Sequence, residues 1–273
     1  MKFTVVGASG FIGGALVATL RKLGHEVNAP VRGAASLLHE PLGHVICAAG
    51  ITADFRTRPF DALRANTALV AELLERAAFD SLLYLSSARI YRHAEHTRED
   101  ARIFLSPEDP EDLYDFTKLT AEALCHASGR ANVRVVRLSN VVGADFRSGK
   151  FLFELIRAAC DDGAIALQSA LDSAKDYVWI GDVVEQVPKI ALSGRHHCYN
   201  LCSGTNLTHR QLLEQIQTVT GARLSVRENA PCTVAAPIDI DRLREEFGYR
   251  PTPVLPLIPP LIDDYRKQRH AEN

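Results

Sequence analysis

Tyr114 and Lys118 lie four residues apart in the segment Asp112-Leu-Tyr-Asp-Phe-Thr-Lys118, which has the pattern of a helix. Residues at this spacing share one face of a helix, so the two side chains are expected to be neighbours. An ordinary phenol has a pKa of about 10 and is a poor base at neutral pH. A nearby ammonium group favours the phenolate, so Lys118 could turn Tyr114 into an acid and base for proton transfer. The alternative is a surface tyrosine beside a solvated lysine.

A second pattern, near the start of the chain, is suited to binding phosphate. The segment Gly7-Ala-Ser-Gly10-Phe-Ile-Gly13 follows a short apolar run and leads into residues 10–23, whose apolar positions have helical spacing. Glycine allows a tight turn and a close approach to a pyrophosphate, which then lies at the amino end of the helix. The spacing is Gly-x-x-Gly-x-x-Gly, and a plain turn between strand and helix is the alternative. We expect a nicotinamide dinucleotide to be contacted by Gly7, Ser9, Gly10, Phe11, Ile12 and Gly13.

The end of the second predicted strand, 26–31, bears on which dinucleotide is bound. A chain that binds NAD usually has Asp or Glu there to accept a hydrogen bond from the ribose 2′-hydroxyl. This sequence instead has Arg32, which could pair with the 2′-phosphate of NADP or could be a solvated surface arginine. We therefore expect NAD or NADP as cofactor, with Arg32 favouring NADP.

The order of the predicted elements indicates an α/β fold with a Rossmann-type, doubly wound parallel sheet. Strand-like runs at 3–6, 26–31, 44–48, 81–86 and 133–138 alternate with helical stretches at 10–23, 60–78 and 114–128. Residues 32–43 are too few for a further helix, strand and helix, so we expect a trimmed sheet beside the adenine end of the cofactor.

The chain divides on this basis into two parts. We assign residues 1–145 and about 172–195 to the dinucleotide-binding domain, with 177–192 returning to the main sheet. A smaller C-terminal lobe for the substrate would contain about 146–171 and 196–273.

The composition excludes several classes of protein. Hydrophobic residues make up 47% and charged residues 23%, as in ordinary globular proteins, and a net charge of −2 provides no basic surface for nucleic acid or membrane. Scattered cysteines and a first strand that starts at residue 2 predict a cytoplasmic protein with reduced thiols. His196, His197, Cys198 and Cys202 could be a metal cluster, but a second ligand pair is lacking. We expect a short buried strand there and no metal.

Taken together, these residues resemble the extended short-chain dehydrogenases/reductases, and especially their NAD-dependent epimerase/dehydratase branch, over nearly the whole chain. The resemblance implies that Ser87, in Leu85-Ser-Ser-Ala-Arg-Ile-Tyr91, hydrogen-bonds the reacting oxygen and forms a catalytic set with Tyr114 and Lys118. Tyr114 and Lys118 would also touch the cofactor. The other contacts with the cofactor that it implies come from Ala48, Ala49, Gly50, Asn66, Leu85 and Ser86.

The same resemblance implies a nucleotide sugar as substrate and is compatible with a homodimer. Asn140 would face the phosphates of the nucleotide sugar. Lys175 stands where the family usually has an arginine that grips the diphosphate. Because lysine is a point charge and arginine a bidentate fork, we expect a weaker or different contact. Arg89 could contact the substrate or be solvated.

The residues after Ser87 bear on the reaction. Dehydratases that resemble this chain have an Asp-Glu pair there, whereas this chain has Ala88 and Arg89. Alanine cannot transfer a proton and arginine stays protonated, so dehydration is not expected. Epimerases and ketoreductases share the remaining residues, which leaves both open. A non-catalytic dinucleotide-binding regulator of the same fold is the alternative, although it would have no use for Ser87, Tyr114 and Lys118 together.

Overall fold

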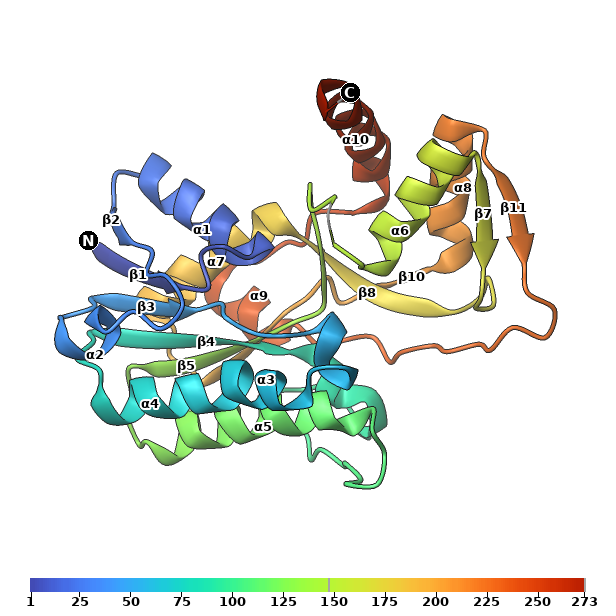
Figure 1. Cartoon of the computed structure of the whole chain (residues 1–273). Helices are drawn as coiled ribbons and strands as arrows, with labels where there is room; N and C mark the ends of the chain where they lie inside the picture. Colours follow the sequence, from blue (N-terminus) through green and yellow to red (C-terminus); the bar gives the residue numbers. More distant parts are fainter. Residues whose placement is uncertain (147, 273) are drawn as a thin grey trace.

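A six-stranded parallel sheet forms the centre of the computed structural model, which describes residues 1–146 and 148–272. Its strands lie in the order β2-β1-β3-β4-β5-β9, and their carboxyl ends point towards the smaller lobe (Figure 1). The strands are β1 (Lys2–Val6), β2 (Glu26–Asn28), β3 (His44–Cys47), β4 (Ser81–Ser87), β5 (Val133–Leu138) and β9 (Cys198–Leu201). This sheet confirms the predicted doubly wound α/β architecture.

Helices cover both faces of the sheet. One face packs against α1 (Phe11–Lys22) and α7 (Ile180–Ser193) (Figure 1). The opposite face packs against α4 (Leu69–Arg76) and α5 (Asp112–Ala127), with α3 (Pro59–Leu63) and the π-helical turn η2 (Arg64–Ala68) leading into α4. Short turns η1 (Ala53–Arg56) and η3 (Ala88–His93) follow β3 and β4.

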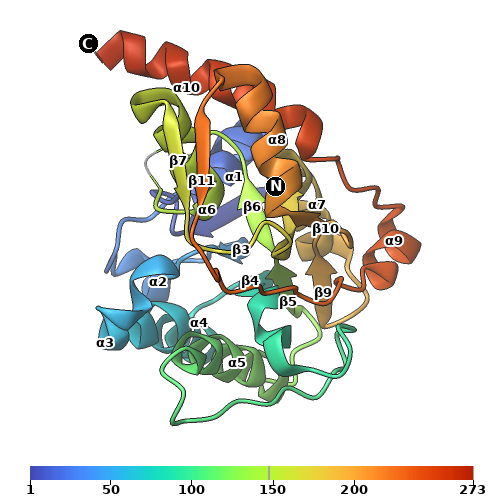
Figure 2. The same ribbon diagram turned by 90° about the vertical axis from the view of Figure 1, so that its right-hand side faces the viewer.

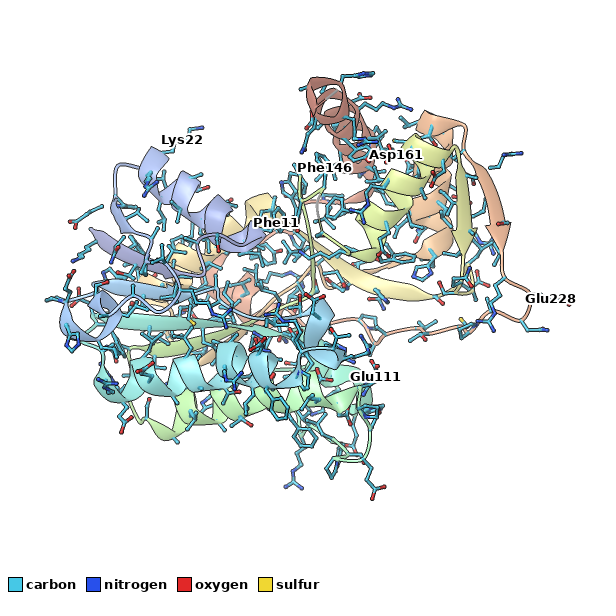
Figure 3. All side chains as sticks on the ribbon, viewed as in Figure 1. Phe11, Lys22, Glu111, Phe146, Asp161 and Glu228 are labelled. Atoms are coloured by element: carbon cyan, nitrogen blue, oxygen red, sulfur yellow. The ribbon has the colours of Figure 1, made fainter. Side chains whose placement is uncertain are left out.

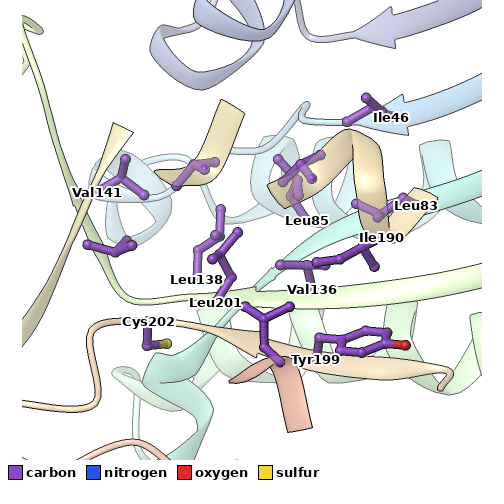
Figure 4. Close-up of a cluster of buried hydrophobic side chains, with 14 of the residues drawn as sticks. Ile46, Leu83, Leu85, Val136, Leu138, Val141, Ile190, Tyr199, Leu201 and Cys202 are labelled. Carbon is purple, nitrogen blue, oxygen red and sulfur yellow. The ribbon is translucent and has the colours of Figure 1, made fainter. Parts of the chain in front are cut away.

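Burial on both faces explains the continuous apolar runs that identify these strands. Successive side chains of a strand point to opposite faces, so Leu83 and Leu85 of β4 pack under α7 beside Ile190. Figure 4 shows this cluster between the sheet and the helix. Leu82 and Tyr84 of the same strand belong to the core on the other face. Each such large buried side chain contributes roughly 1.5–3 kcal/mol to folding.

The segment after β2 is as short as the sequence predicts. It contains only the four-residue helix α2 (Ser36–His39), and β2 is an edge strand of the sheet. Among the described residues, no strand lies beyond β2. The expected trimmed sheet is therefore confirmed.

The smaller lobe has its own sheets and core (Figure 2). Its three-stranded sheet has the order β10-β8-β6, and β7 pairs in parallel with β11. The strands are β6 (Asn140–Val142), β7 (Ala164–Leu167), β8 (Ala174–Trp179), β10 (Asn206–Thr208) and β11 (Arg223–Val226). The helices are α6 (Phe151–Arg157), which continues into the turn η4 (Ala158–Asp162), α8 (His209–Thr220) and, after the turn η5 (Leu255–Leu257), α10 (Ile258–Glu272).

Two strands lie in a different sheet from the one expected. The segment 198–202 was assigned to the lobe, but β9 pairs with β5 in the main sheet, where α9 (Asp241–Phe247) packs against it. Conversely, β8 was expected to return to the main sheet, but it pairs with β6, and only α7 returns. The reason is that β6 follows β5 almost directly and leads the chain out of the main sheet. β8 then pairs with β6 in the smaller lobe.

The predicted buried strand at Cys198 is confirmed: Cys198 and Cys202 are buried, and both are free thiols. Among the helices that the structure describes, none combines the length and the apolar character needed to cross a membrane.

Candidate active site

The glycine loop after β1 is held in a conformation that other residues could not adopt. Gly7 has φ +91°, and a Cβ atom there would lie 2.5 Å from the backbone nitrogen of Ala49. A Cβ atom on Gly13 would lie 2.2 Å from the carbonyl oxygen of Gly7. The glycines therefore allow the loop, the start of α1 and the end of β3 to approach one another closely.

The amino end of α1 is left free by this loop. Gly10 is the N-cap residue and supplies no side-chain hydrogen bond, so the first amides of the helix keep their donors for a ligand. Ser9 and Gly10 are exposed at this point. Such an arrangement fits the pyrophosphate of a dinucleotide, which binds amide donors at the positive end of a helix.

Phe11 and Ile12 are half-buried at the start of α1. A Cβ atom on Gly143 would lie 2.7 Å from the ring of Phe11, and Lys150 Nζ lies 4.7 Å from the centre of that ring. The phenyl ring thus packs against the chain where it enters the lobe, and Figure 3 shows Phe11 at that end of the sheet. Its predicted contact with the cofactor therefore concerns the backbone.

The segment after β3 lies beside the lysine of the Tyr-x-x-x-Lys pair. Ala48 and Ala49 are half-buried and Gly50 is exposed. A Cβ atom on Gly50 would lie 3.3 Å from Lys118 Nζ and 2.9 Å from Asn66 Oδ1. The absence of a side chain at residue 50 therefore leaves space directly next to the lysine.

Asn66 lies in the π-helical turn η2 and is fully buried. Its Oδ1 accepts a hydrogen bond from the Ile51 amide at 2.9 Å, and its Nδ2 donates to the Ile51 carbonyl at 3.2 Å and to Thr117 Oγ1 at 2.9 Å. The side chain thus ties the segment after β3 to α5. Its predicted contact with the cofactor stays a prediction, and its visible role is to hold residues 50 and 51 in place.

The three predicted catalytic side chains come together at the carboxyl end of β4. Tyr114 and Lys118 are 5% and 4% exposed, so neither is a surface residue. Lys118 Nζ lies 5.9 Å from the centre of the Tyr114 ring and donates a hydrogen bond to the Leu85 carbonyl at 3.0 Å. The Ser87 side chain is close enough to the Tyr114 phenol to lower the pKa of that phenol. The alternative of a surface tyrosine with a solvated lysine is therefore wrong.

The environment of Tyr114 differs from the expected one in its charges. Burial raises the pKa of Tyr114 to about 12, while the hydrogen bond with Ser87 and the positive charge of Arg89 lower it. We expected Lys118 to supply that charge. Its ammonium group is directed at the Leu85 carbonyl, so Arg89 acts on the phenol in its place.

Lys118 itself carries a costly charge. Burial lowers its pKa to about 8, although the negative charge of Glu122 opposes the shift. The ammonium lies 4.9 Å from the Tyr84 ring, and no carboxylate among the described residues forms a salt bridge with it. The folded state therefore disfavours the protonated form.

Replacing Lys118 by methionine is expected to stabilise the protein at pH 7 by roughly 1–3 kcal/mol, because a buried charge is replaced by an apolar chain of similar length. The folded pKa of about 8 lies below the unfolded value, so the cost of the charge is fully present below pH 8. It disappears as the pH rises towards about 10.4. Urea unfolding at pH 7 and pH 10 should therefore show a stability gain that narrows at the higher pH.

Lys189→Met is the matched control, because Lys189 pairs with Glu185 on the surface. It should change the free energy of unfolding by less than about 0.5 kcal/mol at either pH. A Lys118→Met variant that is less stable than the wild type at pH 7, or a gain independent of pH, would contradict this account.

Ser86 points away from the other predicted cofactor residues. It is buried, and its Oγ donates to Glu122 Oε1 at 2.5 Å. Glu122 is in turn paired with the buried Arg137 at 2.7 Å, and Arg137 also donates to the Tyr91 hydroxyl at 2.6 Å. Only the backbone of Ser86 remains for the predicted contact. Leu85 is likewise buried, and its carbonyl is taken by Lys118.

Arg89 is neither solvated nor free. Its Nη1 donates to Asp115 Oδ2 at 2.7 Å and to the Glu111 carbonyl at 2.9 Å, and its Nη2 donates to Glu111 Oε2 at 3.1 Å. Glu111 lies directly before α5, at the end of the sheet that faces the lobe (Figure 3). Asp115 and Thr117, which stand between Tyr114 and Lys118, are not among the residues predicted from the sequence. Their position inside that motif was the available signal.

The predicted substrate residues of the lobe lie on its central sheet. Lys175 of β8 lies 5.7 Å from the Phe151 ring, and its pKa is lowered by burial and by the charge of Arg89. Asn140 is exposed at the start of β6 and donates to the Asp176 carbonyl at 2.8 Å. Arg32 is exposed after β2 and, within the described part of the chain, has no hydrogen bond or ion pair.

Comparison with known proteins identifies the family. Residues 3–202 match the model of the NAD dependent epimerase/dehydratase family. The chain belongs to this family. It is accordingly an enzyme of the extended short-chain dehydrogenase/reductase type, with a nicotinamide dinucleotide as cofactor. No curated protein gives a significant match.

Solved structures of the same fold include members with different reactions. One is TunA, an NAD dependent NDP-hexosamine 5,6-dehydratase involved in tunicamycin biosynthesis, with 20% identity, coverage of 97% of this chain and 98% of that one, and a TM-score of 0.82. A second is UDP-glucuronic acid 4-epimerase from Bacillus cereus in complex with UDP-glucuronic acid and NAD, with 19% identity, coverage of 98% of this chain and 99% of that one, and a TM-score of 0.80. A third is RMD from Pseudomonas aeruginosa complexed with NADPH, with 22% identity, coverage of 98% of this chain and 100% of that one, and a TM-score of 0.79.

Proposed function

We propose that this family member is a nucleotide-sugar epimerase or ketoreductase. The observation that carries the proposal is the meeting of Ser87, Tyr114 and Lys118 at the carboxyl end of β4. The bound nicotinamide would exchange a hydride with a sugar carbon. Ser87 would orient the oxygen on that carbon, and Tyr114 would exchange its proton with it. Lys118, held by the Leu85 carbonyl, lies next to the open space over Gly50 and would fix the cofactor there.

The side chains of the lobe would bind the rest of the substrate. Lys175 has no ion-pair partner among the described residues, and it is close enough to Arg89 for their charges to interact. An unpaired, half-buried cation suits an anionic group, and the diphosphate of a nucleotide sugar supplies one. Asn140, exposed at the start of β6, would contribute an amide contact on the same side.

Dehydration is not part of the proposal, although a dehydratase shares the fold. Ala88 is buried and carries no group that transfers protons. Arg89 is held as a cation by two carboxylates, so it is not an acid or base at neutral pH. An epimerase and a ketoreductase both remain consistent with the site.

The test is turnover with a panel of nucleotide sugars. The protein is incubated with UDP-, dTDP- and GDP-linked sugars and either NAD or NADPH, starting with UDP-hexoses and UDP-uronic acids. Absorbance at 340 nm and NMR of the products are recorded. An epimerase yields an isomer without net change at 340 nm, and a ketoreductase consumes NADPH in step with product. Binding of dinucleotide without conversion of any sugar would favour the non-catalytic regulator.

Arg32 is proposed to bind the 2′-phosphate of NADP. Arg32→Ala is expected to weaken the binding of NADPH about tenfold, as for an exposed charged pair worth 1–2 kcal/mol, and to leave the affinity for NADH unchanged. Fluorescence titration with both nucleotides measures the two constants. Lys22→Ala, at the far end of α1, is the control and should change neither. An equal loss of affinity for NADH would contradict the assignment.

A further inference from the structure

Arg89 and Asp115 form an ion pair next to the phenol of Tyr114. Arg89 follows Ser87 by two residues in the turn η3, and Asp115 follows Tyr114 directly on α5. Their Nη1–Oδ2 distance is 2.7 Å, and the side chains are 30% and 0% exposed. A pair this deeply placed is screened by salt much less than a surface pair, so its charges act strongly on their neighbours.

The guanidinium is fixed in position from several sides. Besides Asp115, it bonds to both the carbonyl and the carboxylate of Glu111, and it lies 5.5 Å from the Phe55 ring. Its central carbon is 5.7 Å from the centre of the Tyr114 ring. Lys118 Nζ is at a comparable 5.9 Å, but it is directed at a carbonyl oxygen. Two cations therefore lie beside one phenol.

We propose that Arg89 is a positioning residue for proton transfer, and that its guanidinium, held by Asp115, is the cation that stabilises the phenolate of Tyr114. The inference rests on the proposed function, in which Tyr114 carries the proton. Arg89, which stands where the dehydratases that resemble this chain have an acidic residue, thereby gains a role in proton transfer.

The charges of the pair act on Tyr114 in opposite directions. Arg89 lowers the pKa of Tyr114, whereas the negative charge of Asp115 raises it. Burial raises the pKa of Asp115 to about 6, and Arg89 opposes that shift. Asp115 Oδ1 has no hydrogen-bond partner among the described residues, which is costly for a buried carboxylate. Without Arg89, the ionised carboxylate would be left beside the phenol.

Other charged groups surround the pair and must stay unchanged in the test. Arg92 of η3 pairs with Asp112 and also lowers the pKa of Asp115. Arg56 of η1 pairs with Glu111 from the other side. Lys175 of β8 approaches Arg89 from the lobe. Each variant below therefore replaces a single residue.

The test measures the ionisation of Tyr114 directly in the protein with its bound dinucleotide. Tyrosine is labelled with carbon-13 at Cζ, and the Tyr114 signal is identified by its loss in Tyr114→Phe. Between pH 8 and pH 12, the ionisation of Tyr114 is expected to begin about one pH unit higher in Arg89→Met than in the wild type. In Asp115→Asn it is expected to begin at lower pH, because the carboxylate no longer opposes the phenolate. The pH profile of kcat should move in the same directions.

Arg56→Met is the matched control, because Arg56 bonds to the same Glu111 carboxylate and lies over the same Phe55 ring without touching Tyr114. The titration of Tyr114 in Arg56→Met should coincide with its titration in the wild type. Arg89→Lys keeps the charge but lacks the planar guanidinium. In this variant the titration of Tyr114 should therefore begin at a pH between those of the wild type and Arg89→Met. If Arg89→Met does not fold, Arg89→Lys and Asp115→Asn still decide the question.

An unchanged Tyr114 titration in Arg89→Met, or in both Arg89→Lys and Asp115→Asn, would overturn the proposal. A fall in kcat with an unchanged pH profile would also overturn it, since a purely structural or substrate-binding role predicts that result. The carbon-13 titration requires no substrate. If no variant, nor the wild type, turned over any sugar, the proposed function would fail while the titrations still tested Arg89.

Discussion

Replacing Tyr114 by phenylalanine is expected to lower kcat by about 10²–10⁴-fold, the range typical of losing a general acid or base. The Kd for the dinucleotide should stay within about twofold of the wild-type value. The ring keeps its place, 5.6 Å from Phe55 and beside Lys118, so the packing of α5 against the sheet is preserved. Only the hydroxyl beside the Ser87 side chain is lost.

Turnover is followed by the absorbance change at 340 nm or by NMR of the sugar product, and cofactor binding by fluorescence titration. Tyr265→Phe is the matched control, because the Tyr265 hydroxyl donates to Asp161 within the lobe at 2.6 Å. It should leave kcat unchanged. A Tyr114→Phe variant with more than about a tenth of the wild-type kcat would remove Tyr114 from the proton transfer.

Replacing Gly13 by alanine is expected to weaken dinucleotide binding by about 100-fold or more and to lower the free energy of unfolding by roughly 1–3 kcal/mol. The new Cβ atom would lie 2.2 Å from the Gly7 carbonyl oxygen and 2.7 Å from its carbon. These are backbone atoms, so no side-chain rotation can relieve the overlap. The loop and α1 must separate, and the amides that would meet the pyrophosphate move with them.

Gly14→Ala provides a sharp control for this prediction. Gly14 is the next residue of α1, and its Cβ atom would lie 3.3 Å from the Ala8 carbonyl oxygen, a tight but tolerable contact. Alanine is also the better helix former by about 1 kcal/mol, which offsets the contact. Thermal unfolding with and without NAD separates the loss of stability from the loss of dinucleotide binding. If Gly13→Ala bound the dinucleotide like the wild type, the loop would not be the pyrophosphate site.

The two substitutions have complementary signatures. Tyr114→Phe removes chemistry and keeps binding, whereas Gly13→Ala removes binding at a distance from the reacting groups. A regulator without catalysis would be sensitive to Gly13→Ala and indifferent to Tyr114→Phe. The pair of results therefore separates an enzyme from a dinucleotide-binding protein of the same fold.

The sequence by itself determined the features that depend on short-range spacing. The loop from Gly7 to Gly13, the shared helix of Tyr114 and Lys118, and the shortened segment 32–43 were all predicted correctly. Each follows from the geometry of a few neighbouring residues, because helix and strand periods decide which side chains share a face. The parallel sheet followed in the same way from buried apolar runs that alternate with helices.

Only the tertiary structure decided which distant groups meet. A four-residue strand such as β9 can pair with any open sheet edge, and its place beside β5 depends on where the chain returns. Ser86 and Ser87 differ in role because successive residues of β4 face opposite sides. The partner of Arg89 is Asp115, 26 residues further along the chain, and Lys118 is directed by the Leu85 carbonyl. Long-range hydrogen bonds and burial decide which charged groups lie together, and the spacing of residues along the chain carries no information about these pairs.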